Sequence, residues 1–94
     1  MQVTNINGTS DNTCRCGSWL AHWRTFSRQE LPPLCAEIRC IETPEVGAHV
    51  QKSGSSEWFI IPFCKSHNAL QGQALTVVDW VPLVSANVSQ TCGR

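Results

Sequence analysis

The residues of this chain that are best suited to chemistry are its six cysteines and three histidines. Thiolates and imidazoles are the ligands that zinc prefers in structural sites, where four of them close a tetrahedron. Cys64 and His67 lie three positions apart at the start of a predicted helix, so one helical face presents both to a single ion. Cys35 and Cys40 lie upstream in a loop that has the character of a zinc knuckle. The pattern predicts a metal site built from Cys35, Cys40, Cys64 and His67.

The remaining cysteines allow a second metal site. Cys14 and Cys16 lie on either side of one residue and precede Gly17, whose missing Cβ lets the backbone turn back towards a shared ion. Cys92 and His22 would complete a second tetrahedron. A lone histidine beside the apolar stripe of a helix is, however, more often a packed core residue. We therefore expect one zinc ion per chain, or two if this second set converges.

Two other groupings of ligands remain open at the level of the sequence. In one, Cys14 or Cys16 joins the helical pair of Cys and His in place of the loop cysteines. In the other, His49 replaces Cys35 or Cys40. A third reading is that the six cysteines form disulfides in a secreted domain.

The first thirteen residues help to decide whether the chain is a secreted, disulfide-bonded domain. They are polar, with no positively charged start and no apolar run, so they do not resemble a signal peptide. We therefore expect a cytoplasmic protein whose thiols bind metal rather than each other. No segment approaches the ~20 apolar residues of a membrane span, so no membrane partner is expected.

Length and charge narrow the range of functions. Ninety-four residues are enough for one domain with a modest core, which a bound metal would usefully stabilise. Seven basic and seven acidic side chains cancel, whereas a dedicated nucleic-acid binder usually has a basic excess. Net charge therefore gives no indication of a nucleic-acid partner, and the sequence identifies no protein partner.

The pattern of apolar residues predicts the elements that position the ligands. Trp19, Leu20, Trp23 and Phe26 line one face of a helix, with Ser18 as its N-cap. The expected elements are a helix at about 18–29, a hairpin of strands 46–51 and 57–62, a short helix from 63 to about 72, a strand at 75–81, and a further short strand from 83. Residues 1–13 are expected to be a flexible tail, and residues 14–94 a single zinc-binding domain.

One part of this order has a known counterpart. A Cys pair is followed by a strand Val46-Gly47-Ala48-His49-Val50, a second strand that leads into Ile61-Pro62-Phe63-Cys64, and a short helix Lys65-Ser66-His67-Asn68. Over about residues 33–73 this resembles the HNH group, the zinc-stabilised ββα-metal nucleases of the treble-clef kind. The stretch Cys14-Arg15-Cys16-Gly17-Ser18-Trp19 with His22-Trp23 also resembles small uncharacterised bacterial or phage-associated zinc-binding proteins.

The resemblance implies a small α+β domain, with a treble-clef-like ββα core, an added N-terminal helix and C-terminal strands. In the HNH group the histidine of the first strand is the general base, and residues of the helix bind a divalent metal; His49 and Asn68 occupy these positions. Ala48 and Gly72, however, stand where the group has metal ligands. We therefore expect a zinc-binding protein without catalytic activity, and the alternative is a divergent HNH-type DNA endonuclease.

Overall fold

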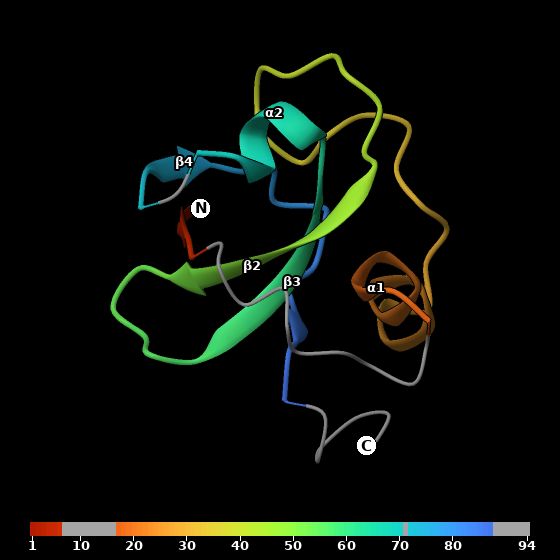
Figure 1. Cartoon of the computed structure of the whole chain (residues 1–94), viewed down its shortest axis with the longest axis horizontal. Coiled ribbons are helices and arrows are strands. Elements are labelled where there is room, and N and C mark those ends of the chain that lie inside the picture. The colour runs from red at the N-terminus through yellow and green to blue at the C-terminus, as the bar shows by residue number, and fades with distance from the viewer. Residues whose placement is uncertain (7–16, 71, 88–94) are drawn as a thin grey trace.

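The computed structural model of the chain describes residues 1–6, 17–70 and 72–87. It has an α+β fold in which five antiparallel strands form one sheet in the order β4-β1-β2-β3-β5. The strands are β1 (Gln2–Asn5), β2 (Val46–Lys52), β3 (Trp58–Phe63), β4 (Ala74–Thr76) and β5 (Val84–Ser85), and the helices are α1 (Trp19–Ser27) and α2 (Lys65–Asn68). Figure 1 shows the β2–β3 hairpin crossing the molecule, with α1 beside it and α2 where β3 ends.

The β2–β3 hairpin was predicted from two β-prone runs around a Gly/Ser turn, and the structure confirms it. The strands pair in register from Val46 opposite Phe63 to Gln51 opposite Trp58. Gly54 in the turn has a φ of 83°, a left-handed conformation that glycine adopts without steric cost. The inward side chains of both strands, with those of neighbouring elements, form the core of the domain.

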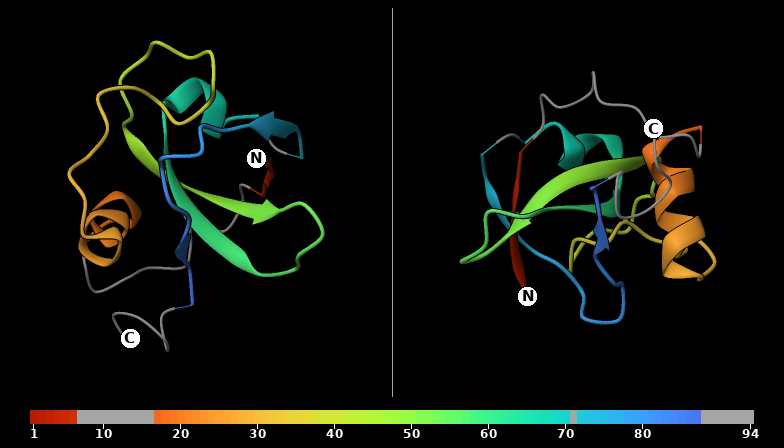
Figure 2. Two further views of the ribbon diagram at one scale, coloured as in Figure 1. Left: turned by 180° about the vertical axis from the view of Figure 1, so that it is seen from behind. Right: turned by 90° about the horizontal axis from the view of Figure 1, so that it is seen from below.

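Helix α1 is the predicted helix, and it ends two residues earlier than expected. The Ser18 hydroxyl accepts a hydrogen bond from the Ala21 N–H at 3.0 Å and so caps the first turn. Trp23 is fully buried, and its Nε1–H donates to the Pro82 carbonyl at 2.8 Å. Helix α1 therefore packs against both the hairpin and the segment that precedes β5. It lies at the end of the molecule away from β1 and β4 (Figure 2).

Gly47 sets how closely α1 approaches the sheet. A Cβ atom at this position would lie 2.4 Å from the Trp19 carbonyl carbon and 2.6 Å from the Leu20 nitrogen. Both atoms belong to the backbone, so no side-chain rotation could relieve the contact. The N-terminal turn of α1 thus rests directly on the β2 backbone, at a position that only glycine permits.

Residues 2–5 correct one sequence-based prediction. Within the expected tail of residues 1–13, Gln2–Asn5 forms strand β1, which lies between β2 and β4. Val3 and Asn5 point into the molecule and are buried, whereas their neighbours are not. Residues 7–13 of the expected tail lie outside the described residues.

Two C-terminal elements are shorter than predicted. Helix α2 ends at Asn68 rather than near residue 72, and β4 ends at Thr76 rather than at residue 81. Beyond β4 the chain leaves the sheet: Val77 forms an isolated bridge with Glu37, and the Val78 N–H donates to the Ala36 carbonyl at 2.9 Å. Within the described ranges, no helix is long and apolar enough to cross a membrane.

Candidate metal centre

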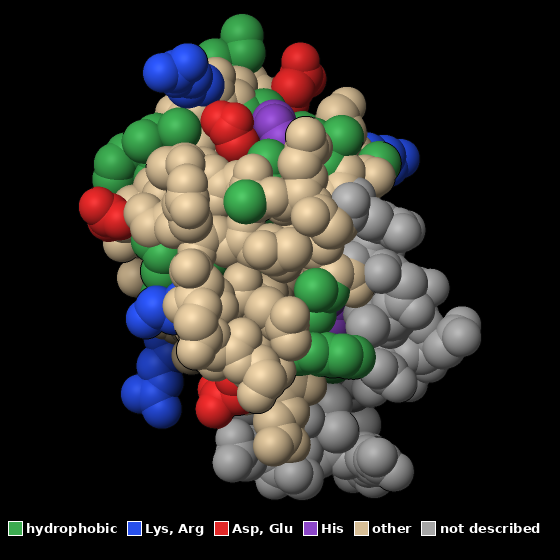
Figure 3. Space-filling view, turned by 90° about the vertical axis from the view of Figure 1, so that its left-hand side faces the viewer, with side chains coloured by type: hydrophobic (Ala, Val, Ile, Leu, Met, Phe, Trp, Pro, Cys, Tyr) green, Lys and Arg blue, Asp and Glu red, His purple; other side chains and the backbone are tan. Residues whose placement is uncertain are grey.

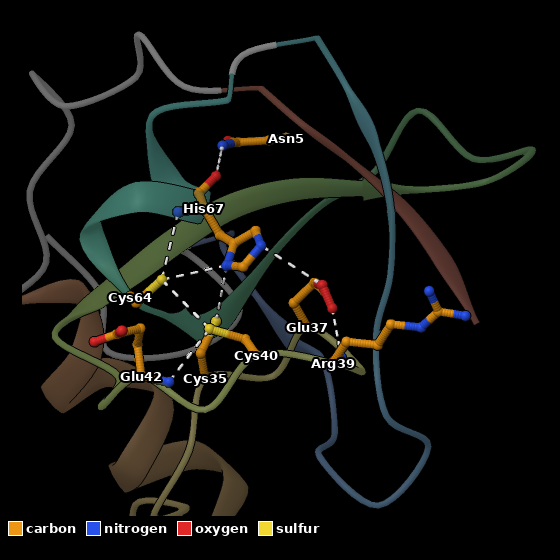
Figure 4. Close-up of polar contacts among 8 residues, drawn as sticks. All are labelled: Asn5, Cys35, Glu37, Arg39, Cys40, Glu42, Cys64 and His67. Carbon is orange, nitrogen blue, oxygen red and sulfur yellow. Dashed lines mark hydrogen bonds and ion pairs between the residues drawn. The ribbon is translucent and has the colours of Figure 1, made fainter.

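The four predicted ligands come together at one end of the β2–β3 hairpin. Cys35 and Cys40 lie in the loop between α1 and β2, Cys64 directly follows β3, and His67 lies in α2. Their three sulfur atoms and the histidine nitrogen all lie within 4.8 Å of one another. Figure 4 shows the side chains converging on a common point from these separate elements. This is the one such group among the residues that the structure describes.

Three of the distances between these atoms are close to those of a tetrahedral zinc site. With Zn–S bonds of about 2.3 Å and Zn–N bonds of about 2.0 Å, the edges are about 3.8 Å between two sulfurs and about 3.5 Å between sulfur and nitrogen. The Cys40 and Cys64 sulfurs are 3.8 Å apart. The His67 Nδ1 lies 3.6 Å from the Cys35 sulfur and 3.2 Å from the Cys64 sulfur. The four residues are therefore positioned to hold a metal ion, with a donor set that suits zinc.

The distances between the sulfur atoms also test the interpretation that these cysteines form disulfides. All three described cysteines are free thiols. Disulfide sulfurs lie about 2.05 Å apart, far closer than the 3.8 Å between Cys40 and Cys64. For these three residues the metal-binding interpretation fits the geometry and the disulfide interpretation does not.

Backbone N–H groups donate hydrogen bonds to two of the sulfurs. Cys64 is the N-cap of α2, and its sulfur accepts a hydrogen bond from the His67 N–H at 3.4 Å. The Cys40 sulfur accepts one from the Glu42 N–H, also at 3.4 Å. The loop itself is closed by a hydrogen bond from the Cys35 N–H to the Glu42 carbonyl at 2.8 Å. The short loop and the helix start thus fix the direction of each sulfur.

Glu37 supports the histidine from the far side of its ring. Its Oε2 lies 3.5 Å from His67 Nε2, and its side chain is only 15% exposed. With a metal on Nδ1, the ring proton stays on Nε2 and faces this carboxylate, which fixes the tautomer and the ring orientation. Glu37 Oε1 also accepts a hydrogen bond from the Arg39 N–H. Sequence reasoning missed Glu37, although an acidic residue between two knuckle cysteines was the available indication.

Asn5 holds the helix that carries His67. This fully buried side chain donates from Nδ2 to the His67 carbonyl at 3.0 Å and to the Asn68 carbonyl at 2.7 Å. Both carbonyls lie at the end of the short helix α2, beyond which no helical N–H follows. The His67 carbonyl also accepts a hydrogen bond from the Leu70 N–H at 3.2 Å. Strand β1 therefore braces the ligand-bearing helix, a role that nothing in the sequence indicated.

Burial raises the pKa of the Cys35 thiol to about 12, although backbone hydrogen bonds from Cys64 and Glu37 act in the opposite direction. Without a cation, a thiol in this position holds its proton at neutral pH. A divalent ion reverses this preference, because it stabilises the thiolate that burial disfavours. Three thiolates held this close together are thus unfavourable in free energy without a metal ion, and favourable when they surround a divalent cation.

The second predicted metal site cannot be assembled from the described residues. Cys14, Cys16 and Cys92 lie outside them, so this site stays a prediction. His22 is described and is fully buried in α1. Its Nε2 lies 2.9 Å from the Ser85 carbonyl oxygen, and its ring packs against Trp19 and Phe26. This environment is that of a packed core histidine.

His49 does not belong to the Cys/His cluster, so the alternative in which it replaces a loop cysteine is wrong. It lies in β2, opposite Ile60, with its ring edge-on to Trp19 at a centroid distance of 4.6 Å. Burial, together with the nearby His22, lowers the pKa of His49 to about 4. Its imidazole is therefore neutral at neutral pH.

His49 and Asn68, the two predicted catalytic residues, border the same pocket. This pocket has a volume of about 320 Å³ and lies between the start of α1, the start of β2 and α2. Glu45 is the acidic residue that lines it, and Lys65 forms an ion pair with that carboxylate at 3.5 Å. In the described part of the chain the pocket has no cluster of carboxylates or histidines around a second metal position.

Comparison with known proteins does not place this site in a family. No family model matches the chain, and neither a curated protein nor a solved structure shows significant similarity to it.

Proposed function

We propose that this chain is a zinc-binding protein in which one zinc ion, held by Cys35, Cys40, Cys64 and His67, maintains the fold. The observation that carries the proposal is that four ligand atoms lie within 4.8 Å of one another, with three of their distances, at 3.8, 3.6 and 3.2 Å, close to the edges of a zinc tetrahedron. In a domain of this size a structural zinc contributes about 10–16 kcal/mol of binding free energy that becomes folding free energy. The ion would join the loop between α1 and β2 to the end of β3 and to α2.

The donor set favours a structural role over a catalytic one. Catalytic zinc sites have three protein ligands and leave the fourth position to water or substrate, whereas structural sites are closed by four. Here four protein ligands converge, and Cys35 and Cys64 are buried at 3% and 4% exposure. A substrate would find no free coordination position at the ion.

Metal content and spectroscopy test this proposal directly. Purified wild-type protein should hold zinc that resists dialysis, at one ion per chain for this site. Replacement by Co²⁺ should give the visible bands of a tetrahedral thiolate complex. An octahedral spectrum, or a protein that folds fully after chelation, would contradict the proposal.

Variants of α2 separate the ligands from their neighbours. Cys64→Ser should abolish tight zinc binding and greatly lower the thermal stability, because it removes one of the four ligands. Ser66→Ala is the matched control, since Ser66 is an exposed residue of the same short helix. It should retain both the metal and the fold. Equal metal content in the two variants would rule out Cys64 as a ligand.

A divergent HNH-type endonuclease is the second candidate function, and one observation favours it: His49 and Asn68 line a common pocket. His49 would take a proton from water that attacks a phosphodiester. Its lowered pKa keeps it unprotonated but makes it a weak base. The purified protein should then nick plasmid DNA in the presence of Mg²⁺, and His49→Ala should abolish the nicking. Activity that persists in His49→Ala would point to a contaminating nuclease.

A further inference from the structure

Next to the metal centre, the surface carries an apolar groove that the zinc proposal does not explain. Its volume is about 290 Å³, and it lies between the knuckle loop and the segment that follows β4. We call it the Trp80 groove, and its apolar walls are formed by Pro33, Leu34, Ile38, Val78, Trp80 and Val81. Cys35 and Cys40 also contribute to its lining, so the metal site fixes one wall.

The apolar side chains of this groove are exposed to an unusual degree. Trp80 is 75% exposed, Ile38 54% and Leu34 45%. Large apolar side chains that are grouped on the surface of a small protein typically mark an interaction site, and tryptophan is the residue type most enriched at binding hot spots. Figure 3 shows one face of the molecule, where hydrophobic side chains gather at the upper left with acidic and basic side chains around them. The groove thus has the composition of the centre of an interface.

The charges around the groove are predominantly negative. Glu37 lines it, Asp79 directly precedes Trp80, and Glu42 follows two residues after Cys40, whereas Glu30, before the lining, pairs with Arg24 at 3.6 Å. Arg39 is the one basic residue within these segments, and its side chain extends away from the Cys/His cluster (Figure 4). Asp79 pairs with the N-terminal amine yet its side chain stays 89% exposed. Three thiolates around a dication add a further net negative charge to the adjoining site.

This charge selects among the partners that an apolar groove could accept. A second copy that docked through the same face would set acidic residues against acidic residues, because a two-fold interface pairs a surface with itself. A nucleic acid would bring its phosphates towards the same carboxylates. A segment with an apolar anchor between lysines or arginines, by contrast, would fill the groove and meet complementary charge.

We propose that the Trp80 groove is a docking site for a basic segment of another protein, with an apolar side chain seated against Trp80 and a flanking lysine or arginine facing the exposed Asp79. The site is separate from the His49 pocket. It needs the knuckle loop in place but not any particular metal, so it can be tested independently of the identity of the ion.

Selection from random peptides displayed on phage, against the metal-loaded full chain, tests the proposal. The enriched peptides should carry apolar anchors flanked by lysine or arginine. A labelled peptide of the enriched sequence should bind wild-type protein, as measured by fluorescence anisotropy. Trp80→Ala should weaken this binding by about tenfold or more, as expected for loss of an interfacial tryptophan. Trp58→Ala, at a half-exposed tryptophan outside the groove, should leave it unchanged.

The charged part of the site has its own test. Asp79→Lys should weaken binding of the basic peptide, and a peptide with glutamate in place of its basic residues should not bind. Metal content and thermal stability are measured on each variant, so loss of the zinc site would be seen separately from loss of docking. Failure to enrich any peptide, enrichment of acidic peptides, or equal binding by Trp80→Ala would overturn the proposal. So would a wild-type dimer that Trp80→Ala dissociates, since the occupant would then be a second copy.

Discussion

Replacing Gly47 by alanine tests the packing of α1 against the sheet. The added Cβ would meet the Trp19 carbonyl carbon at 2.4 Å, whereas non-bonded carbon atoms prefer a separation of about 3.5–4.0 Å. Relief therefore requires α1 and β2 to move apart by about 1 Å. A gap of this size forfeits a quarter to a half of the dispersion attraction across the interface.

The expected loss of stability follows from what α1 buries. Trp23 is fully buried on this helix, and removing such a side chain typically costs about 3–5 kcal/mol. A quarter to a half of that is about 1–2.5 kcal/mol. In a domain of this size, each kcal/mol lowers the melting temperature by about 4–8 °C. We therefore expect Gly47→Ala to melt at least 4 °C below wild type, and up to about 20 °C below it.

Thermal unfolding followed by circular dichroism, with zinc in excess, measures this loss. Gly54→Ala is the comparison variant, because an alanine there meets no neighbouring atom but must adopt a φ of 83°. That strain costs roughly 1–2 kcal/mol. Both variants should retain one zinc ion, since neither glycine contacts the ligands. If Gly47→Ala melted within about 2 °C of wild type, the close contact between α1 and β2 would be refuted.

Three further variants test the support of the site and the buried strand residues. Glu37→Gln should weaken zinc binding by about 10–100-fold in competition with a chelator while leaving the stoichiometry unchanged; unaltered affinity would show that the carboxylate does not orient His67. Asn5→Ala should lower the free energy of unfolding by about 1–3 kcal/mol in urea titrations, because two carbonyls at the end of α2 lose the hydrogen bonds that the Asn5 side chain donates. His49 has a pKa of about 4 in the folded protein and of about 6.5 in the unfolded chain, so acid favours unfolding. The free energy of unfolding should therefore be fully retained above pH 6.5 and fall as the pH falls towards 4, by about 2 kcal/mol between pH 7 and pH 5. The wild-type chain should show this loss relative to His49→Leu, and parallel pH profiles of the two proteins would contradict it.

Local patterns in the sequence were sufficient for the elements whose stability is largely local. Trp19, Trp23 and Phe26 gave α1 by their spacing, and two β-prone runs around a turn gave the hairpin. The spacing of Cys64 and His67 placed both on one side of a single helical turn, and the structure has them there. The loop cysteines were expected to join them, and the structure brings all four side chains together. The rival grouping with Cys14 or Cys16 involves residues outside those that the structure describes, so it is not tested.

The features that were not predicted from the sequence share a physical cause. Strand β1 has one apolar residue, Val3, and its strand conformation depends on pairing with β2 and β4, which are distant in the sequence. No local pattern can encode such a partner. Asn5 and Glu37 were missed for the same reason, because each acquires its role only when the fold brings it to His67. Whether the sheet and helix belong to a treble-clef or HNH scaffold remains a proposal.

The position of β1 within the sheet has a consequence for the solubility of the protein. Strand β2 is paired with β3 over residues 46–51 and with β1 over residues 50–52, so its C-terminal part has a neighbour on both sides. Were β1 trimmed or displaced, the longest strand of the sheet would present unpaired N–H and C=O groups, and β4 would lose its neighbour. Open strand edges of this kind pair with other chains and lead to aggregation. The four residues of β1 thus cover a strand edge that would otherwise be open to pairing with another chain.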